Sequence, residues 1–264
     1  MSRVEWFDLP VAVRVSVGAR VGAVTGVVDV EHGLTCRLAA VLSTPDGRVF
    51  VKGVPVTDLD ATVAQDFEAA VNGRVAGIGP LLLGRVAVAG WDVLIFEYVD
   101  GRHADLAPGS PHVDLVAGLL HEMEALSADG LAPPFADRLD GHVDGAGRLL
   151  LAGNALLHTD ISSHNLLVDG ATGRVHLVDW AMPAAGPAWV DVAFTAVRLM
   201  ENGWAADAAL EWAGGFASWR DADPVAVEAF VAATCSAWHA RVGSAGAQPN
   251  NRRFRALLAG PVAV

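Results

Sequence analysis

The sequence predicts an α+β protein with two segregated lobes. Its first hundred residues read mostly as short β-prone runs, and the pattern becomes helical after Gly101. Strands that come first and helices that follow are typical of this class, in which the sheet and the helices occupy different parts of the molecule. Hydrophobic residues make up 53% of the 264 residues and charged residues only 18%, so the chain can bury a core and is not expected to be disordered.

The first part of the chain predicts a sheet with one helix. The β-prone runs are residues 24–30, 36–43, 48–54, 81–89 and 91–99. Residues 44–47, Thr-Pro-Asp-Gly, are a turn signal that makes a hairpin of the second and third runs. Asp58 is the expected cap of a helix over residues 58–76, in which apolar residues from Val63 to Val71 recur at helical spacing.

The second part predicts helices. One begins after Ser110-Pro111, where a capping residue precedes Pro, and carries an apolar stripe from Val113 to Leu126. Two more are expected over residues 189–200 and 224–238, the last again opened by a cap-plus-Pro pair. Residues 129–147 are rich in Gly, Pro and Asp and are predicted to form a loop.

Charge and composition narrow the function. The net charge of −12 disfavours nucleic acid as a partner, because such binding depends on Lys and Arg. It suits a cationic small molecule, although an acidic surface also simply keeps a protein soluble. The apolar stretches are interrupted, so no membrane span is expected, and no secretory signal is readable, which predicts a cytoplasmic protein. Cys36 and Cys235 form neither a disulfide framework nor a metal set.

Residues 158–165 carry the clearest chemical signal. They read H-x-D-x-x-x-x-N, with Asp160 and Asn165 as the polar members, and Asp179 follows at the end of a second apolar run. Phosphoryl transfer needs one carboxylate to accept the proton of the attacking hydroxyl and oxygen ligands that hold magnesium on the phosphates. Asp160 can serve as the carboxylate, and Asn165 and Asp179 can serve as the ligands.

The chain has 17 Arg and a single Lys, which is Lys52 in the third predicted strand. A composition that favours Arg and retains one Lys indicates a role for a compact ammonium group. In a kinase site that role is to bind the α- and β-phosphates, with a Glu on the following helix as partner. Glu68 lies on that helix. The alternative is a surface Lys beside a surface Glu.

Taken together, these motifs resemble the aminoglycoside phosphotransferase family of small-molecule kinases. The motifs are Lys52, Glu68, His158-x-Asp160-x4-Asn165 and Asp179-Trp180, in the order and approximate spacing of that family. The resemblance implies a bilobal protein-kinase-like α+β fold. Its N-lobe, an antiparallel sheet plus a helix, would span residues 1–97 and bind nucleotide. Its mainly helical C-lobe, residues 98–264, would hold the catalytic loop and the acceptor.

The resemblance also implies a role for each matching residue. Asp160 would be the catalytic base, and Asn165 and Asp179 would bind Mg²⁺. Lys52 would contact the phosphates of ATP or GTP, and Glu68 would hold Lys52.

For the nucleotide base, residues 96–101 resemble the hinge between lobes. There the carbonyl of Glu97 and the N–H of Val99 would pair with adenine, and Leu167 and Val178 would enclose the ring. The nucleotide loop is thin, with Gly33 as its only glycine.

Two further residues around the catalytic loop follow from the resemblance. Asp191 resembles a family Asp that braces the catalytic loop by accepting backbone hydrogen bonds; a carboxylate at a helix N-terminus is the simpler alternative. The family usually has Gly where this chain has Thr159. Because a β-branched residue disfavours a left-handed backbone, an ordinary φ is expected at Thr159.

Three roles remain open for such a phosphotransferase. It could be an antibiotic kinase that phosphorylates a hydroxyl of an aminoglycoside or another cationic drug. It could be a metabolic kinase for a sugar or an amino alcohol, which shares every motif. It could also be a non-catalytic nucleotide-binding member, against which the complete set of site residues argues. Acceptor choice and oligomeric state have no readable code, because a fold does not determine them.

Overall fold

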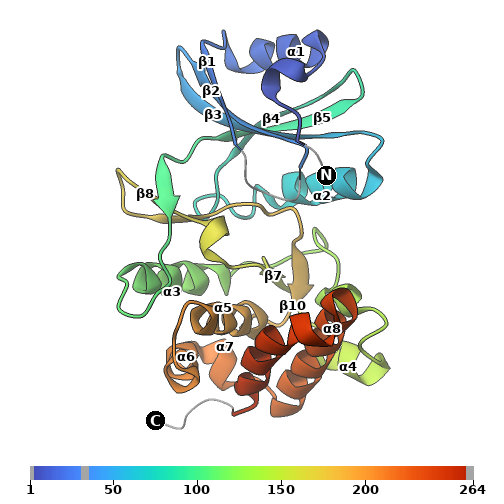
Figure 1. Cartoon of the computed structure of the whole chain (residues 1–264), viewed down its shortest axis with the longest axis vertical. Helices are drawn as coiled ribbons and strands as arrows, with labels where there is room; N and C mark the ends of the chain where they lie inside the picture. The colour runs from blue at the N-terminus through green and yellow to red at the C-terminus, as the bar shows by residue number, and fades with distance from the viewer. Residues whose placement is uncertain (1–2, 31–35, 260–264) are drawn as a thin grey trace. The chain divides into compact units, whose positions relative to one another are not determined.

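A computed structural model describes residues 3–30 and 36–259 (Figure 1). The chain divides into two compact units. The first unit runs to Gly101 and also contains Asp169–Ala171 and His176–Met182, and the second contains the rest. The predicted α+β class is confirmed, because strands dominate the first unit and helices the second. The division into lobes after residue 97 stays a prediction; the first unit also takes in segments that lie well beyond that point in the sequence.

The first unit contains a five-stranded sheet. Its strands are β1 (Gly26–Asp29), β2 (Leu38–Thr44), β3 (Gly47–Pro55), β4 (Leu82–Val88) and β5 (Trp91–Glu97). Their order is β1-β2-β3-β5-β4, and every neighbouring pair is antiparallel. In the central strand β3, Lys52 lies between Ala39 of β2 and Leu94 of β5. The single Lys of the chain is therefore in the middle of the sheet.

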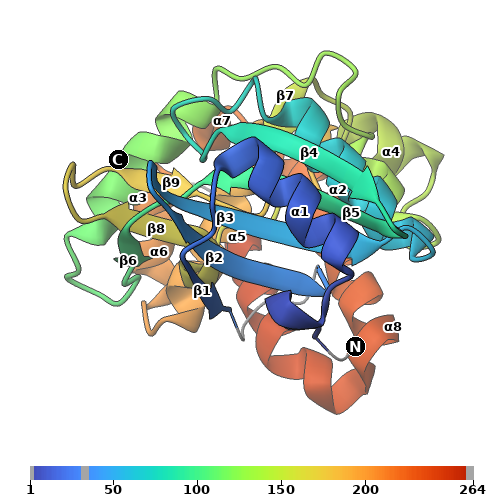
Figure 2. The same ribbon diagram turned by 90° about the horizontal axis from the view of Figure 1, so that it is seen from above.

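Helix α1 (Val11–Val21) covers one face of this sheet (Figures 1 and 2). Val13 and Val17, one turn apart on the helix, are fully buried against residues of the strands. The sequence prediction missed α1, because its alternating Val residues are as typical of a strand as of a helix. Burial against the sheet decides in favour of the helix.

Helix α2 (Leu59–Val71) contacts the other side of β3 and β5. The predicted cap is confirmed, since the Asp58 side chain accepts a hydrogen bond from Ala61 N at 3.3 Å. The predicted apolar stripe is wrong at Val63 and Ala70, which are exposed, whereas Gln65 and Glu68 are buried. This face of the sheet carries polar side chains, and buried polar groups need polar partners.

The second unit contains most of the helices. They are α3 (His112–Met123), α4 (Gly145–Leu150), α5 (Trp189–Glu201), α6 (Ala206–Ala213), α7 (Ala217–Arg220) and α8 (Pro224–Ala256). The predicted stripe on α3 is confirmed, with Val113, Val116 and Met123 buried. The predicted loop over residues 129–147 is only partly right, because it contains a short 3-10 helix, η2 (Phe135–Leu139), and the start of α4. Five aromatic rings from η2, α5 and α8 pack together: Phe135, Trp189, Phe194, Phe230 and Phe254.

Helix α8 begins as predicted, with the Asp223 side chain accepting a hydrogen bond from Val225 N at 2.9 Å. It continues to Ala256, well beyond the predicted end near residue 238. Gly243 interrupts it with a φ of 75°, a conformation that glycine adopts at little cost. Within residues 3–30 and 36–259, no helix is long and apolar enough to cross a membrane.

Short strands support the loops that follow. β7 (Ala155–Leu157) pairs with β10 (Ala184–Gly186) in the second unit. β6 (Gly101–His103), β8 (Leu166–Asp169) and β9 (Val175–Leu177) form a further small sheet. The H-x-D-x-x-x-x-N segment follows β7 directly, and Asp179 lies two residues after β9.

Candidate active site

Lys52 and Glu68 form a buried ion pair in the first unit. The ammonium group of Lys52 contacts Glu68 Oε2 and also lies 2.9 Å from Asp179 Oδ1. The Lys52 and Glu68 side chains are 6% and 5% exposed, and that of Asp179 is 29% exposed. Burial lowers the pKa of Lys52, but the two carboxylates outweigh it, so the pKa lies well above its usual value. Lys52 is therefore a fixed positive charge in a site with two negative ones.

A close approach of two backbone segments holds Asp179 in the first unit. Leu177 N donates to Ile78 O at 2.9 Å, and Trp180 Nε1 donates to Leu177 O at 3.0 Å. Gly79 lies against Leu177 and Trp180, since a Cβ at position 79 would be 2.9 Å from Leu177 O and 3.3 Å from Trp180 Nε1. Asp179 itself has a φ of 66°, which Asp tolerates better than most residues.

Gly79→Ala is therefore expected to lower the free energy of unfolding by about 1–3 kcal/mol, because the methyl group forces the Leu177 carbonyl and Trp180 aside. Denaturant unfolding measures the change. Gly73→Ala is the matched control, since a Cβ at Gly73 meets nothing within 4 Å. Equal effects at the two positions would contradict the assigned close approach.

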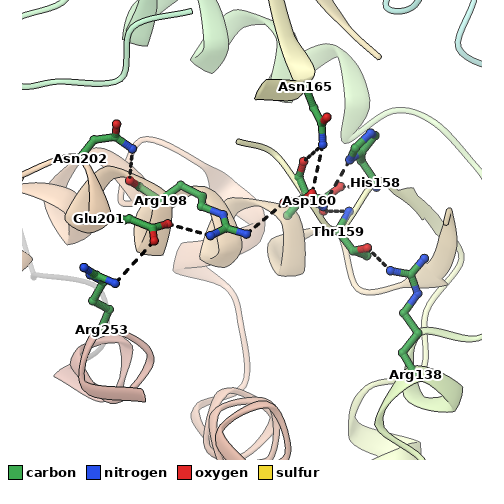
Figure 3. Close-up of polar contacts among 10 residues, drawn as sticks. Arg138, His158, Thr159, Asp160, Asn165, Arg198, Glu201, Asn202 and Arg253 are labelled. Atoms are coloured by element: carbon green, nitrogen blue, oxygen red, sulfur yellow. Dashed lines mark hydrogen bonds and ion pairs between the residues drawn. The ribbon is translucent and has the colours of Figure 1, made fainter. Parts of the chain in front are cut away.

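Asp160 and Asn165 meet in the second unit. The Asn165 amide nitrogen donates to Asp160 Oδ2 at 3.1 Å and to Asp160 O at 2.9 Å. Figure 3 shows Asn165 on one side of Asp160 and Arg198 on the other, with the Asn165 amide oxygen turned away from Asp160. The Asp160 carboxylate is exposed, so it is accessible to a hydroxyl group.

Asp191 holds the backbone of the loop that carries Asp160. It lies in the first turn of α5, is 3% exposed, and accepts from His158 N at 2.8 Å and from Thr159 N at 2.7 Å. Burial raises the pKa of Asp191 to about 6, and the two backbone hydrogen bonds act in the opposite direction. His158 adds a further contact, because its Nδ1 accepts from Asp160 N at 3.3 Å. Asp191 therefore acts on the residues that immediately precede Asp160.

The expected ordinary φ at Thr159 is wrong. The structure has φ 68° there, in the left-handed region. The two Asp191 hydrogen bonds fix the local backbone, and the guanidinium of Arg138 donates to Thr159 Oγ1 (Figure 3). The surrounding contacts thus override the intrinsic preference of a β-branched residue.

The residues proposed for the nucleotide base are distributed between the units. Glu97 ends β5, where its N–H donates to Leu81 O at 2.9 Å, and Val99 follows it. Both belong with Lys52 to the first unit, as does Val178, whereas Leu167 lies in β8 within the second. Gly33 lies outside the described residues.

Arg48 anchors the segment after β5, a contact that the sequence did not reveal. Its guanidinium lies 2.6 Å from Asp100 Oδ2 and 4.3 Å from the centre of the Tyr98 ring. These contacts connect β3 to the residues on both sides of Val99.

A resident metal would need oxygen ligands here. The described part of the chain contains no group of three or more His, Cys, Asp or Glu side chains that could hold a metal ion by itself. Magnesium is commonly bound by one or two protein oxygens together with substrate phosphates. Asp179 in the first unit, a partly exposed carboxylate, and Asn165 in the second unit, whose amide oxygen is turned away from Asp160, each have an oxygen of that kind.

Comparison with known proteins finds a family model that matches part of the chain. Residues 124–230, which include Asp160, Asn165, Asp179 and Asp191, match the model of the phosphotransferase enzyme family (APH). This segment is similar to that family. The predicted family resemblance and the predicted enzyme class, a phosphotransferase, are confirmed. No curated protein matches the chain.

Solved structures support the fold of this chain. Choline kinase LicA from Streptococcus pneumoniae matches with a TM-score of 0.61 and 13% identity, covering 94% of this chain and 98% of the other. Macrolide 2'-phosphotransferase MphH from Brachybacterium faecium gives 0.57 and 16%, covering 96% and 99%. An aminoglycoside-3'-phosphotransferase of type VIII gives 0.52 and 17%, covering 93% and 97%. The predicted protein-kinase-like fold is confirmed.

The sequence analysis did not identify two arginines within residues 124–230, Arg138 and Arg198. Arg198 lies 3.0 Å from Asp160 Oδ1 and 2.7 Å from Glu201 Oε2, and Glu201 is 3.8 Å from Arg253. Its spacing of seven residues from Asp191, two helical turns, was a readable sign that both face the catalytic loop. Arg138, in a segment predicted as loop, had no such sign.

Proposed function

We propose that the chain transfers the γ-phosphate of ATP or GTP to a hydroxyl of a small molecule. The observation that carries the proposal is the exposed carboxylate of Asp160, which ends a loop whose backbone is held by the buried Asp191. The ion pair of Lys52 and Glu68 supports it independently, since it holds a cation in a fixed geometry that suits binding of phosphates. LicA has been solved with AMP, which supports a nucleotide as donor.

In the proposed reaction Asp160 accepts the proton of the acceptor hydroxyl as its oxygen attacks the γ-phosphorus. The bond from that phosphorus to the bridging oxygen breaks, and the nucleoside diphosphate leaves. Asn165 and Arg198 each donate to Asp160, so the carboxylate has a fixed orientation before the acceptor arrives. Positioning of this kind supplies much of the rate in phosphoryl transfer.

On the donor side, Lys52 contacts the phosphates and Glu68 keeps its ammonium group in place. Asn165 and Asp179 would hold magnesium, which when bound offsets the charge on the phosphate oxygens. The Glu97 carbonyl and the Val99 N–H would pair with the adenine edge, and Leu167 and Val178 would contact its ring. Gly33 would lie in the loop over the phosphates.

For the acceptor, we propose a cationic antibiotic of the aminoglycoside type, phosphorylated in the cytoplasm, so that the protein would act in antibiotic resistance. The net charge of −12 supports a cationic partner. The alternative is an amino alcohol or a sugar of metabolism. The structural similarity to choline kinase LicA and to an ethanolamine kinase from Plasmodium vivax supports an amino alcohol as the alternative acceptor.

The test is phosphate transfer followed by mass spectrometry of the acceptor. Purified protein receives Mg²⁺, ATP or GTP, and a panel of aminoglycosides, macrolides, cationic peptide antibiotics, amino alcohols and sugars. We expect a product heavier by one phosphoryl group with an aminoglycoside. A product with choline or ethanolamine alone would replace the antibiotic role by the metabolic one. Nucleotide binding without transfer to any acceptor would favour the non-catalytic role.

Activity is also expected to depend on the protonation of Asp191. Since its pKa is about 6 in the folded protein, kcat should fall as the pH drops through about 6, because a protonated oxygen cannot accept the hydrogen bond from the loop. The free energy of unfolding should change in the opposite direction and increase as the pH drops through about 6. A raised pKa means that Asp191 contributes stability below its ordinary value of 3.8, and that this contribution is lost as the pH rises through about 6.

The measurement is kcat against pH from 5 to 8, with the unfolding midpoint recorded at each pH. Asp191→Asn should remove this titration and slow the reaction at every pH. Asp114→Asn, which changes an acid in the first turn of α3, is the matched control. An acid limb that persists unchanged in Asp191→Asn would assign the titration to another group.

A further inference from the structure

Thr159 adopts a backbone conformation that its side chain opposes. The described non-glycine residues with positive φ are Ala89, Asp129, Thr159 and Asp179. Thr159 is the β-branched one among them, and for such a residue this region is a true outlier. Its carbonyl leads directly into Asp160, so any relaxation of φ at Thr159 moves the carboxylate proposed as base.

The Asp191 hydrogen bonds do not explain why threonine is tolerated. They run to the N–H groups of His158 and Thr159, and any residue at position 159 other than proline could donate the second one equally well. Glycine, which the family resemblance leads one to expect here, would need no more than this, because it adopts positive φ freely. A threonine needs a further contact that acts on its side chain.

Arg138 supplies that contact. It lies on η2, between the buried Phe135 and Leu139, so its Cα is fixed by the core. One guanidinium nitrogen donates to Thr159 Oγ1, and the other donates to Pro183 O at 3.2 Å (Figure 3 shows the contact with Thr159). The guanidinium thus connects the Thr159 hydroxyl to the backbone that leads into β10.

The surroundings of Arg138 cost energy, which argues against an incidental contact. Burial lowers the pKa of Arg138 to about 10, although the charges of Asp191 and Asp160 oppose the shift. Its guanidinium hydrogen bonds go to a neutral hydroxyl and a neutral carbonyl. Burying part of a cation whose hydrogen-bond partners are neutral costs free energy, so packing alone does not account for an arginine at this position.

We propose that Arg138 is a positioning residue that holds Thr159 in the left-handed conformation and thereby sets the place of Asp160. Arg138 and Thr159 together do in this chain what a glycine does unaided. The effect on the reaction rests on the proposed function, because it requires Asp160 to act in catalysis. The effect on the conformation of the loop does not rest on the proposed function.

The test is a double-mutant cycle with Arg138→Met and Thr159→Gly. Arg138→Met is expected to lower kcat about tenfold with KM for the nucleotide unchanged, since the strain of a left-handed β-branched residue is no longer offset. Adding Thr159→Gly should recover most of that loss. A merely structural Arg138 predicts no recovery, because glycine at position 159 fills none of the space that the guanidinium leaves.

A second comparison avoids the buried cation. Thr159→Ala and Thr159→Gly both remove the hydroxyl, but only alanine keeps a Cβ that opposes positive φ. Thr159→Ala should therefore be slower than Thr159→Gly. Arg148→Met is the matched control for Arg138→Met, since Arg148 lies nearby in α4 and forms ion pairs with the exposed Asp137 and Asp140.

The unfolding midpoint keeps the inference testable if no acceptor is phosphorylated, an outcome that would count against the proposed function alone. Arg138→Met should lower the midpoint by about 3 °C more in the parent protein than in the Thr159→Gly variant. Equal losses in the two backgrounds, or no recovery of kcat in the double variant, would overturn the assignment of Arg138.

Discussion

Replacing Asp160 by asparagine is expected to lower kcat by about 10²–10⁴-fold, because this is the range that a general base contributes. Asparagine has nearly the same shape but cannot take a proton from the acceptor hydroxyl. It can still accept the hydrogen bond from Asn165 through its amide oxygen. Nucleotide affinity should not change, because the proposed phosphate and base contacts do not involve Asp160.

The measurement is kcat and KM for the phosphorylated acceptor, with nucleotide Kd from titration calorimetry. Asp137→Asn is the matched control, since Asp137 is an exposed acid of the same unit whose ion pair with Arg148 lies on the surface. Activity close to that of the parent protein in Asp160→Asn would refute the mechanism. A loss of nucleotide binding in the same variant would place Asp160 in the donor site instead.

Removing the charge of Lys52 is expected to cost both activity and stability. Lys52→Met leaves Glu68 buried with no cation beside it and removes the ammonium group that Asp179 contacts. Breaking a buried ion pair by removing one member costs about 3–5 kcal/mol, because the remaining charge is uncompensated. The phosphates lose their cation in the same variant, so transfer should fall below detection.

A second substitution separates the two effects of Lys52. In Lys52→Met/Glu68→Met the buried carboxylate is gone as well, and replacing a buried pair by apolar residues is often close to neutral. Denaturant unfolding should therefore recover most of the lost stability while activity stays absent. Arg174→Met is the control, because its pairing with Glu122 is exposed and such pairs contribute at most about 1 kcal/mol. Recovery of transfer in the double variant would exclude Lys52 from phosphate binding.

Much of the architecture was predictable because it depends on local signals. The sheet strands and the stripe on α3 follow from apolar periodicity, and the Asp58 and Asp223 caps follow from the need to satisfy helix N-termini. Helix α1 was missed, since Val-rich segments fit the periodicity of a strand as well as that of a helix. Val63 was misplaced for another reason: Glu68 and Gln65 face the sheet to satisfy buried polar groups, which hydropathy does not reveal.

The residues of the candidate site likewise fall into those that the sequence revealed and those that it did not. Asp160, Asn165, Asp179 and Lys52 stand out in the sequence because phosphoryl transfer needs those residue types in that order. Arg138 does not, because an arginine beside this loop has the same local sequence signs as one on the surface, and Arg198 is marked only by its helical spacing from Asp191. Their partners, Thr159 and Asp160, lie 21 and 38 residues away in the chain.

Residue type and short-range spacing were enough to predict the α+β class, and the order of the motifs carried the resemblance to the phosphotransferase family. Three other features were visible only in the folded chain: α1 is a helix, Lys52 also contacts Asp179, and Thr159 has a φ of 68°. The physical reason is common to all three. Each is an unfavourable or ambiguous local choice that contacts from distant parts of the chain make favourable.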